Sequence, residues 1–403
     1  MQIILFGKII ETWKKNLTAL CISQFFYRAG TRSLIPFLPL FIQDLGKTAP
    51  ESTAIWSGWI FAAPFIISFF TTPFWGSFGD KYGRKLMTIL AVFGFAAAQF
   101  LMGLSANLTQ LILFASLQEA MGGFYPAAVS LTASNTPKEK TAQALGILQF
   151  ANGSGNVVGP ILGGILADLV GLREVFFLIA VTVGLSGFLI IFFIDEKNFT
   201  REDHNYYFLT KNWRYVFDNK KLIICMLFLL IYSLAVTVVR PTFSLFIKSM
   251  NFTLNNSSTV TGILLGVFGG TSALASALVG KLTVKRKINS ILLFASIIVT
   301  ATYFLLSFVS SVSFLIIVLA VGGFGLGLIQ PLVFTLVSHN TDDNRKAGVF
   351  GVGSSFQVIG NLFGSVSAGY IVSEFGLRFP FVAAGLLFFL VIFIVLFGLK
   401  KNL

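Results

Sequence analysis

The 403-residue chain has few charged residues: Asp, Glu, Lys and Arg make up 11% of it, whereas hydrophobic residues make up 55%. A soluble domain carries roughly 25% charged residues, so this chain lacks the polar side chains that would cover a water-exposed surface. It also has only two cysteines, Cys21 and Cys225, and both lie inside apolar stretches, which argues against a disulfide framework or a cysteine metal site. The sequence shows no P-loop, no Ser-His-Asp set and no metal-ligand cluster. We therefore expect no cofactor, no metal and no enzymatic activity.

Apolar stretches of about 20 residues, long enough to cross a bilayer, recur along the whole chain. They predict an all-α membrane protein with twelve transmembrane helices. The N-terminal MQIILFGKIIETWKK has too short an apolar core for a cleaved signal peptide. The predicted spans are residues 17–42, 54–74, 86–105, 108–133, 142–168, 174–194, 222–247, 259–280, 289–308, 313–338, 347–372 and 379–398.

The net charge of +13 would suggest a nucleic-acid partner in a soluble protein, but its placement gives another explanation. Most Lys and Arg fall at the termini and in alternate loops, such as 76–85, 195–221 and 281–287. The positive-inside rule then predicts cytoplasmic termini, a multi-pass protein of the inner (plasma) membrane, and no nucleic-acid partner. The loops of the opposite side carry only Lys47, Arg173, Lys248 and Arg378.

The chain repeats itself, because residues 126–176 align without a gap on residues 331–381. An even number of spans per repeat keeps both copies in the same orientation. We predict two pseudo-symmetric six-helix bundles, residues 1–194 and 222–403, joined by a cytoplasmic linker at 195–221, with a site between the bundles at mid-membrane. Matching pairs include Asn135 with Asn340, Asn156 with Asn361, and Arg173 with Arg378.

Two glycine-containing stretches stand out. In GSFGDKYGRK (76–85), the glycines permit a tight turn, and Asp80 and Arg84 are within reach of each other if the loop is helical. A merely solvated basic turn would explain Lys81 and Lys85 but not the glycine spacing or the lone acid. In GSGNVVGPILGG (153–164), glycines four residues apart let helices approach closely, and Pro160 frees a carbonyl and bends the helix. Ordinary close packing would also explain these glycines.

Together with FLPLF (37–41) and MGGFYPAAVSLTASNTPKEKTAQALG (121–146), these stretches resemble the major facilitator superfamily, in particular its drug:proton antiporter, or multidrug efflux, branch. The resemblance covers most of the chain and is strongest from residue 30 to 180. It implies alternating access and favours export over import. Members of this branch usually carry an Arg, associated with proton coupling, where this chain has Ala115, so the resemblance does not carry the branch's usual coupling mechanism over to this chain. The resemblance implies a conformational latch at Gly76, Asp80, Gly83 and Arg84, and an antiporter motif at Gly155, Gly159, Pro160, Gly163 and Gly164.

Charged residues inside the predicted spans are the candidate transport groups. Glu119 is the only acidic residue deep in a span, near the bilayer centre at 1.5 Å per residue, where an isolated charge costs several kcal/mol. Arg28 and Arg32 lie four residues apart in the first span and can pair with it. Further candidates for the cavity are Gln24 and Tyr27 in the same span, and Arg240 beside Pro241.

Three interpretations of these charges stay open. In the first, Glu119 carries a proton and an arginine tunes it. In the second, the arginines bind an anionic substrate group by bidentate hydrogen bonds. In the third, the charges form a structural ion pair, and Arg240 reaches outward to the interface.

We therefore predict a secondary transporter, a proton-coupled exporter of small amphipathic or drug-like molecules that works as a monomer in the lipid bilayer. One alternative is an exporter of an anionic metabolite, such as a carboxylate siderophore or another organic anion. An alternative of another class is a membrane sensor or scaffold that transports nothing.

Overall fold

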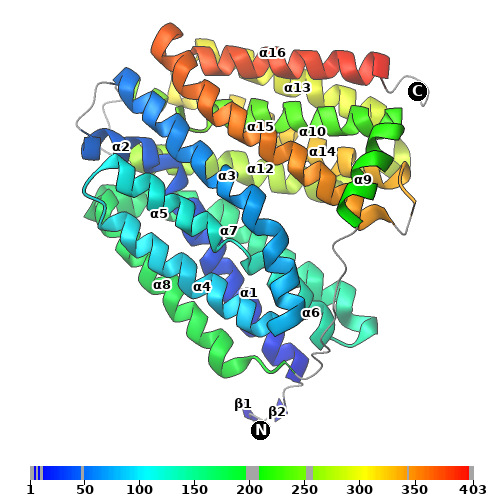
Figure 1. Ribbon diagram of the computed structural model, residues 1–403. Helices are drawn as coiled ribbons and strands as arrows, with labels where there is room; N and C mark the ends of the chain where they lie inside the picture. Colours follow the sequence, from blue (N-terminus) through cyan, green and yellow to red (C-terminus); the bar gives the residue numbers. More distant parts are fainter. Residues whose placement is uncertain are drawn as a thin grey trace. The chain divides into compact units, whose positions relative to one another are not determined.

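The computed structural model describes residues 4–5, 8–9, 12–46, 50–196, 208–250, 257–342 and 345–398. Within these ranges the regular secondary structure is helical apart from two short strands near the N-terminus, which pair antiparallel (Figure 1). The all-α prediction is confirmed. The elements are β1 (Ile4–Leu5), β2 (Lys8–Ile9), α1 (Thr12–Ser33), η1 (Ile35–Phe37), α2 (Leu38–Gly46), α3 (Pro50–Tyr82), α4 (Arg84–Gly103), α5 (Leu108–Ala120), α6 (Phe124–Asn135), η2 (Lys138–Lys140), α7 (Thr141–Val170), α8 (Leu172–Phe193), α9 (Phe208–Asp218), α10 (Lys220–Val239), α11 (Phe243–Ser249), α12 (Ser257–Lys285), α13 (Ile288–Phe308), α14 (Val312–His339), α15 (Lys346–Phe375), α16 (Phe379–Phe393) and η4 (Ile394–Gly398).

Ten helical segments of the described chain are long and apolar enough to cross a membrane. The predicted spans 17–42 and 108–133 are not among them, and the structure interrupts both. The first contains Pro36, which disfavours helical geometry at the residue before it, and the chain passes through η1 between α1 and α2. The second is divided into α5 and α6 at residues 121–123. The count of twelve spans stays a prediction.

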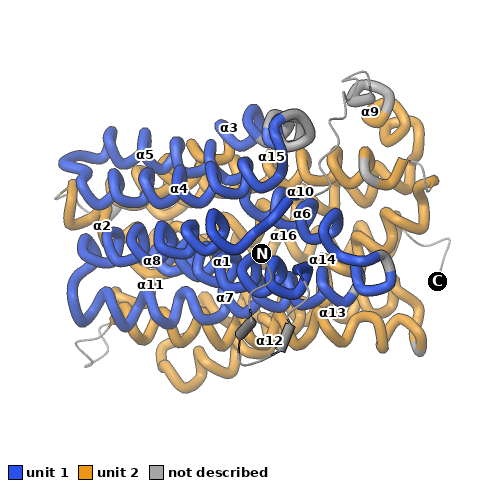
Figure 2. Tube along the Cα trace, turned by 90° about the horizontal axis from the view of Figure 1, so that it is seen from below, with its two compact units in different colours: residues 1–37, 66–204 blue, residues 38–65, 205–403 orange. Residues whose placement is uncertain are grey.

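The helices group into two compact units (Figure 2). Unit 1 comprises residues 1–37 and 66–204, and in it α1 packs against α7 and α8, and α4 against α5, α6 and α8. Unit 2 comprises residues 38–65 and 205–403, and in it α10 packs against α15 and α16, and α14 against α12 and α13. The predicted division into bundles 1–194 and 222–403 stays a prediction.

Residues 38–65 join unit 2 through close backbone contacts. A Cβ at Gly58 of α3 would lie 2.7 Å from the Ser365 carbonyl oxygen of α15, and one at Gly369 would lie 2.7 Å from the Ala54 carbonyl oxygen. Nearby, the Lys248 ammonium donates a hydrogen bond of 3.0 Å to the Gln43 amide oxygen. Glycine thus lets the first half of α3 lie directly against α15.

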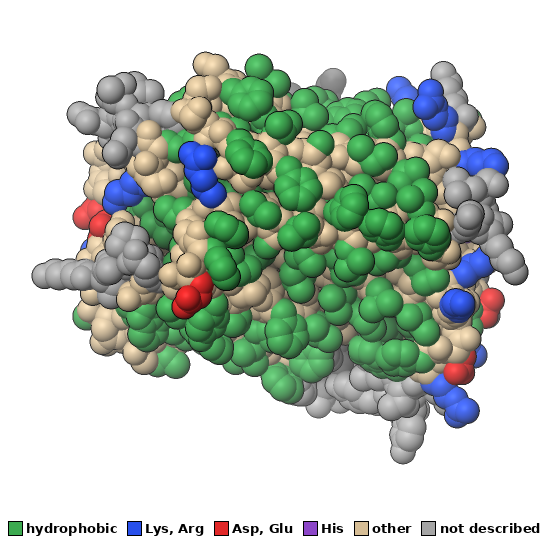
Figure 3. All heavy atoms as spheres, turned by 90° about the horizontal axis from the view of Figure 1, so that it is seen from above, with side chains coloured by type: hydrophobic (Ala, Val, Ile, Leu, Met, Phe, Trp, Pro, Cys, Tyr) green, Lys and Arg blue, Asp and Glu red, His purple; other side chains and the backbone are tan. Residues whose placement is uncertain are grey.

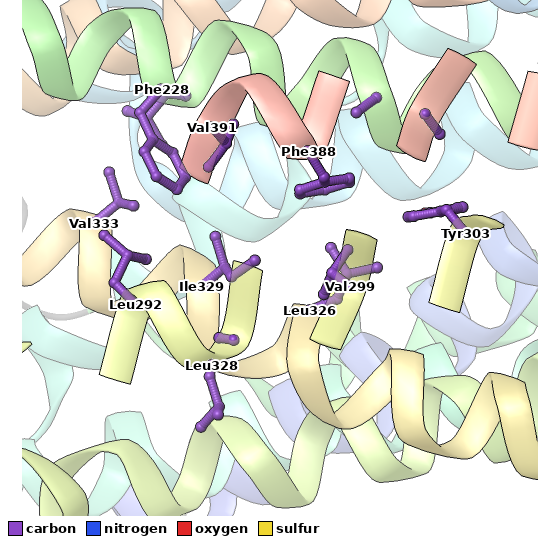
Figure 4. Close-up of a cluster of buried hydrophobic side chains, with 14 of the residues drawn as sticks. Phe228, Leu292, Val299, Tyr303, Leu326, Leu328, Ile329, Val333, Phe388 and Val391 are labelled. Carbon is purple, nitrogen blue, oxygen red and sulfur yellow. The ribbon is translucent and has the colours of Figure 1, made fainter. Parts of the chain in front are cut away.

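The core of unit 2 is a layer of buried apolar side chains between its helices (Figure 4). Phe228 of α10, Leu326 of α14 and Phe388 of α16 are all buried in it. The Tyr303 ring of α13 stacks on Phe388 with the ring centroids 5.5 Å apart. Side chains from four helices therefore hold this unit together by dispersion contacts.

The outer surface is apolar where a bilayer would cover it. Figure 3 shows hydrophobic side chains over the middle of one face, with charged side chains toward its two ends. On α16, Leu386, Phe389, Leu390 and Phe393 are all exposed. Exposed apolar side chains of this kind fit contact with lipid.

The predicted linker contains an ordered helix. Trp213 of α9 stacks on Phe356 of α15 at 5.8 Å between ring centroids. The Arg345 guanidinium lies 4.6 Å from the centre of the Tyr215 ring, within the range of a cation–π contact. The second part of 195–221 is therefore packed onto unit 2.

The sequence repeat builds the same turn twice. Gly171 and Gly376 both have positive φ, 99° and 88°, a conformation that favours glycine. Arg173 donates a hydrogen bond of 3.0 Å to a backbone carbonyl just after α4, and Arg378 donates one of 3.1 Å to a carbonyl in the last turn of α13. In each unit the arginine therefore binds a carbonyl at or just beyond a helix end, where carbonyls lack helical hydrogen-bond partners.

Candidate functional site

The candidate site lies in unit 1, where α7 runs against α1. A Cβ at Gly159 would lie 2.6 Å from the Ala29 carbonyl oxygen, and one at Gly163 would overlap the Ser33 carbonyl oxygen. Gly155 makes the same kind of contact one turn earlier. The glycines four residues apart thus let the two backbones touch.

Other members of the predicted antiporter motif lie on the same helix. Pro160 and Gly164 are both buried in α7, and the helix continues through the proline. Because proline has no N–H, the carbonyl of Asn156, four residues earlier, receives no helical hydrogen bond from it. The role of the motif in antiport stays a prediction.

Polar side chains of α1 and α7 form a row of hydrogen bonds across the contact between these two helices, which we call the seam. The Gln24 amide donates to Asn152 Oδ1 at 2.9 Å. One helical turn on, the Arg28 Nε–H donates to Asn156 Oδ1 at 2.9 Å, and the Arg32 Nε–H donates to the same oxygen at 3.0 Å. The structure therefore brings three of the predicted residues together on the side of α1 that faces α7.

Asn156 is the central residue that the sequence did not single out. Its amide oxygen accepts from both guanidiniums, and its amide nitrogen donates to the Asn152 carbonyl at 3.1 Å. A signal was present in the repeat, because Asn156 aligns with Asn361. There the Thr237 hydroxyl donates to Asn361 Oδ1 at 2.7 Å, so α15 and α10 repeat the arrangement with an uncharged donor.

A break between α5 and α6 shapes the other side of the site. The Gly122 N–H donates to the Glu119 carbonyl at 2.9 Å, which closes the last turn of α5. The Trp75 indole N–H of α3 donates to the Ala120 carbonyl at 2.7 Å, and its ring lies against Gly123. The single helix that we expected over residues 108–133 is therefore interrupted at the site.

Glu119 lies at the C-terminal end of α5, partly exposed. Its carboxylate is hydrogen bonded with Ser68 of α3, and the charges of Arg32 and Arg28 act on it through space. The Nε–H group of each guanidinium is turned toward Asn156, and a direct Glu–Arg pair stays a prediction.

The tyrosines near the site differ in environment. Tyr27 is buried, with its ring 4.6 Å from that of Phe124 and 4.8 Å from that of Phe95, so it packs behind the break. Tyr125, in the first turn of α6, is partly exposed, and its hydroxyl donates to the Gln149 amide oxygen. Tyr27 thus supports the site, whereas Tyr125 lies at its accessible side.

Arg240 lies in unit 2, at the C-terminal end of α10, and is partly exposed. Its charge acts on the partly buried Tyr232 and the buried Tyr303. Its place in a shared cavity stays a prediction.

The loop 76–85 has a partner that the sequence did not indicate. Gly83 has a φ of 100°, and the Glu196 carboxylate accepts hydrogen bonds of 3.0 Å from the backbone N–H groups of Arg84 and Lys85. An acid at this end of α4 satisfies free amides and interacts favourably with the helix dipole. The side chain of Asp80, like residue Gly76, lies outside the described residues, so the latch stays a prediction.

This arrangement can bind ions and polar groups. It offers two cations and one acid deep in an apolar unit. In the described ranges, no group of three or more His, Cys, Asp or Glu could hold a metal ion.

Comparison with protein families identifies the family of the chain. A family model described as "Major Facilitator Superfamily" matches residues 20–357 and 242–402. Similar curated proteins include the multidrug resistance protein MdtG of Salmonella schwarzengrund, 32% identical over 379 residues, and that of Salmonella arizonae, 31% identical over 379 residues. Each alignment covers 94% of this chain and 94% of the relative.

Solved structures share the fold at low sequence identity. The nucleoside transporter NupG is 12% identical with a TM-score of 0.80, covering 95% of this chain and 99% of its own. A bacterial homologue of the human lysosomal transporter Spinster, inward-facing and occupied, is 16% identical with a TM-score of 0.76, covering 96% of each chain. The human organic anion transporter MFSD10 is 15% identical with a TM-score of 0.67, covering 96% of this chain and all of its own.

Proposed function

The chain belongs to the major facilitator superfamily, and we propose that it is a proton-coupled exporter of small amphipathic or drug-like molecules that works by alternating access. The relatives named as multidrug resistance proteins support export of such compounds. The proposal includes an inner-membrane location with both termini in the cytoplasm, because most of the basic residues lie on one side of the predicted topology.

Glu119 carries the proposal of proton coupling. An ionised carboxylate at mid-membrane costs several kcal/mol unless it is paired, hydrated or neutralised. A bound proton removes this cost, and so does a cationic group of the transported molecule. Proton and cargo then compete for one carboxylate, which is the requirement for antiport.

The test uses purified protein in proteoliposomes with an internal pH dye and an imposed pH gradient. Amphipathic amines added to the wild type should trigger proton movement, and Glu119→Gln should abolish it while the protein stays folded. The matched control is Glu374→Gln, which neutralises an exposed acid near the end of α15 and should behave like the wild type.

Two results would contradict the proposal. Full proton movement in Glu119→Gln would remove this carboxylate from the coupling. If no compound of any charge moved protons or crossed the membrane, the chain would be a sensor or scaffold that transports nothing.

A further inference from the structure

The helix α9 and the start of α10 form a basic surface at one end of unit 2. Residues 211–221, KNWRYVFDNKK, contain four basic residues and one acid. Figure 1 shows α9 lying across this end of the unit, at a steep angle to α10. The segment Lys220–Ser249 is long and apolar enough to span a bilayer, so the chain enters the bilayer at the start of α10. A chain that enters there places α9 along the membrane surface, at the depth of the lipid headgroups.

The inner side of α9 is fixed to unit 2. Val216 is buried in the core of the unit, and Asn212 is buried against α15, where a Cβ at Gly348 would overlap its amide. Trp213 stacks on Phe356 of α15. These contacts hold α9 in place, so its outward side chains stay at this surface whether or not a ligand is bound.

The outward side of α9 combines an aromatic ring with charged side chains. Phe217 is 55% exposed, and its ring stacks on Trp213 with the ring centroids 6.0 Å apart. Arg214 lies 3.9 Å from Asp218, so these two charges have opposite partners. Helices at a membrane surface place Trp, Phe and Leu side chains at the boundary between headgroups and acyl chains. The exposed ring of Phe217 fits this boundary.

The charge that has no partner is on Lys220 and Lys221, the first two residues of α10. Both are exposed, and neither ammonium group has a hydrogen bond or an ion pair among the residues that the structure describes. The Asn219 side chain accepts a hydrogen bond of 3.0 Å from the backbone N–H of Lys221, which fixes the start of the helix. Two free ammonium groups favour an anionic ligand, and a lipid phosphate is the anion present at this depth.

An apolar surface continues from the lysines along α10. Lys220, Ile224 and Leu227 share one face of the helix by their spacing, and Leu227 is exposed. The segment η4 lies beside this face, because a Cβ at Gly398 would lie 3.2 Å from the Ile224 side chain. Phe397 of η4 is 69% exposed. A ligand that binds the lysines therefore has apolar side chains beside it, in the direction of the bilayer centre.

We infer that α9 and the start of α10 bind an anionic phospholipid of the bilayer. Lys220 and Lys221 bind its phosphate, Phe217 lies at the boundary between headgroup and acyl chains, and an acyl chain runs along the exposed face of α10. The occupant is a lipid because the site has a charged end at the membrane surface and an apolar side along a membrane span. The lipid attaches the second part of the predicted linker 195–221 to the bilayer. The inference does not depend on the proposed function.

The test measures lipid binding to the purified full-length protein in detergent by native mass spectrometry. The probes are dioleoylphosphatidylglycerol, which is anionic, and dioleoylphosphatidylcholine, which has the same acyl chains and no net charge. Each basic residue near a bilayer strengthens the attraction of an anionic lipid about five-fold. Lys220→Gln combined with Lys221→Gln should therefore weaken phosphatidylglycerol about 25-fold and leave phosphatidylcholine unchanged.

The matched control is Arg286→Gln combined with Lys287→Gln, which removes the same charge. These exposed residues join α12 to α13, and two membrane crossings separate them from Lys220, so they lie at the same end of unit 2. The control pair should keep the wild-type preference for phosphatidylglycerol. Lys220→Arg combined with Lys221→Arg keeps both charges and should keep it as well.

Hydrogen exchange in nanodiscs locates the bound lipid. Adding phosphatidylglycerol to phosphatidylcholine nanodiscs should slow exchange in residues 212–222 of the wild type. The variant with both lysines replaced by Gln should show no such slowing, although it should melt at the wild-type temperature because both side chains are exposed.

Three results would overturn the inference. If the two lipids bind equally to the wild type, the surface has no site for an anionic lipid. If the control pair weakens phosphatidylglycerol as much as the lysine pair does, the attraction comes from the total surface charge. If glycerophosphoglycerol, the headgroup without acyl chains, binds as tightly as the lipid, the ligand is a free phosphate compound. None of these results changes the proton movement that tests the proposed function, so each can fail without the other.

Discussion

Gly159→Ala tests how the contact between α1 and α7 positions the charged site. The added Cβ would stand 2.6 Å from the Ala29 carbonyl oxygen, whereas ordinary van der Waals contact begins at 3.4 Å. Backbone lies on both sides of this contact, so no side chain can turn away. The helices must therefore separate by about 0.8 Å, the difference between these two distances.

A separation of that size reaches the site one turn away. The hydrogen bonds from Arg28 and Arg32 to Asn156, now 2.9 and 3.0 Å, would exceed 3.5 Å and cease to be hydrogen bonds. Overpacking of a helix contact costs about 1–3 kcal/mol. We expect the free energy of unfolding to fall by this amount and the affinity for the transported molecule to fall about ten-fold, because the guanidiniums lose their fixed position.

The matched control is Gly153→Ala, on the same helix, where no heavy atom lies within 4 Å of the added Cβ. Alanine there should be neutral or stabilising by about 0.5–1 kcal/mol, since glycine is the poorer helix former. Thermal unfolding in detergent and cargo binding by calorimetry should be measured for both variants. Equal melting temperatures and equal affinities in the two variants would refute the idea that this seam positions the arginines.

Two further changes test local contacts of unit 1. Glu196→Ala removes the acceptor for the first amides of α4 and should lower stability by about 0.5–2 kcal/mol, with faster hydrogen exchange confined to the first turn of that helix; unchanged exchange there would exclude a capping role. Trp75→Phe removes the donor to the Ala120 carbonyl and should lower stability by about 0.5–1.5 kcal/mol while slowing transport, measured in proteoliposomes. Wild-type transport with the expected loss of stability would show that transport does not depend on the hydrogen bond from Trp75 to the break at 121–123.

The helical fold was predictable because a bilayer dictates it. Apolar stretches of about 20 residues can only be helices when water is absent, and the described chain is helical where they occur. The break at 121–123 was not predictable in the same way. Gly122 and Gly123 permit it, but the indole of Trp75, nearly fifty residues earlier in the chain, binds the freed carbonyl. A local pattern cannot show a partner supplied by another helix.

The charged residues of the site were predictable, but their partners were not. Spacing alone placed Gln24, Arg28 and Arg32 on one face of a helix. Asn156 was not predicted because an uncharged amide inside a span costs much less free energy than a charge and therefore gives a weaker signal. Nothing in the neighbouring sequence shows which helix its side chain faces. Glu196 was not predicted because it lies in the segment predicted to be a linker, more than a hundred residues from the backbone amides that it binds.

Comparing the two repeats distinguishes the residues that build the scaffold from those that determine substrate specificity. Both units bring glycines against backbone carbonyls, Gly159 against α1 and Gly364 against α10, and both place an asparagine at the equivalent position, Asn156 and Asn361. The charges do not repeat. The position of Arg32 is Thr237 in the second half, and α14 continues as one helix through the stretch that aligns with the break between α5 and α6. In a duplicated scaffold, the two equivalent helix contacts give both units the same packing. Recognition of one substrate, by contrast, needs side chains that differ between the two units. The residues that depart from the repeat are therefore the ones from which substrate choice should be argued.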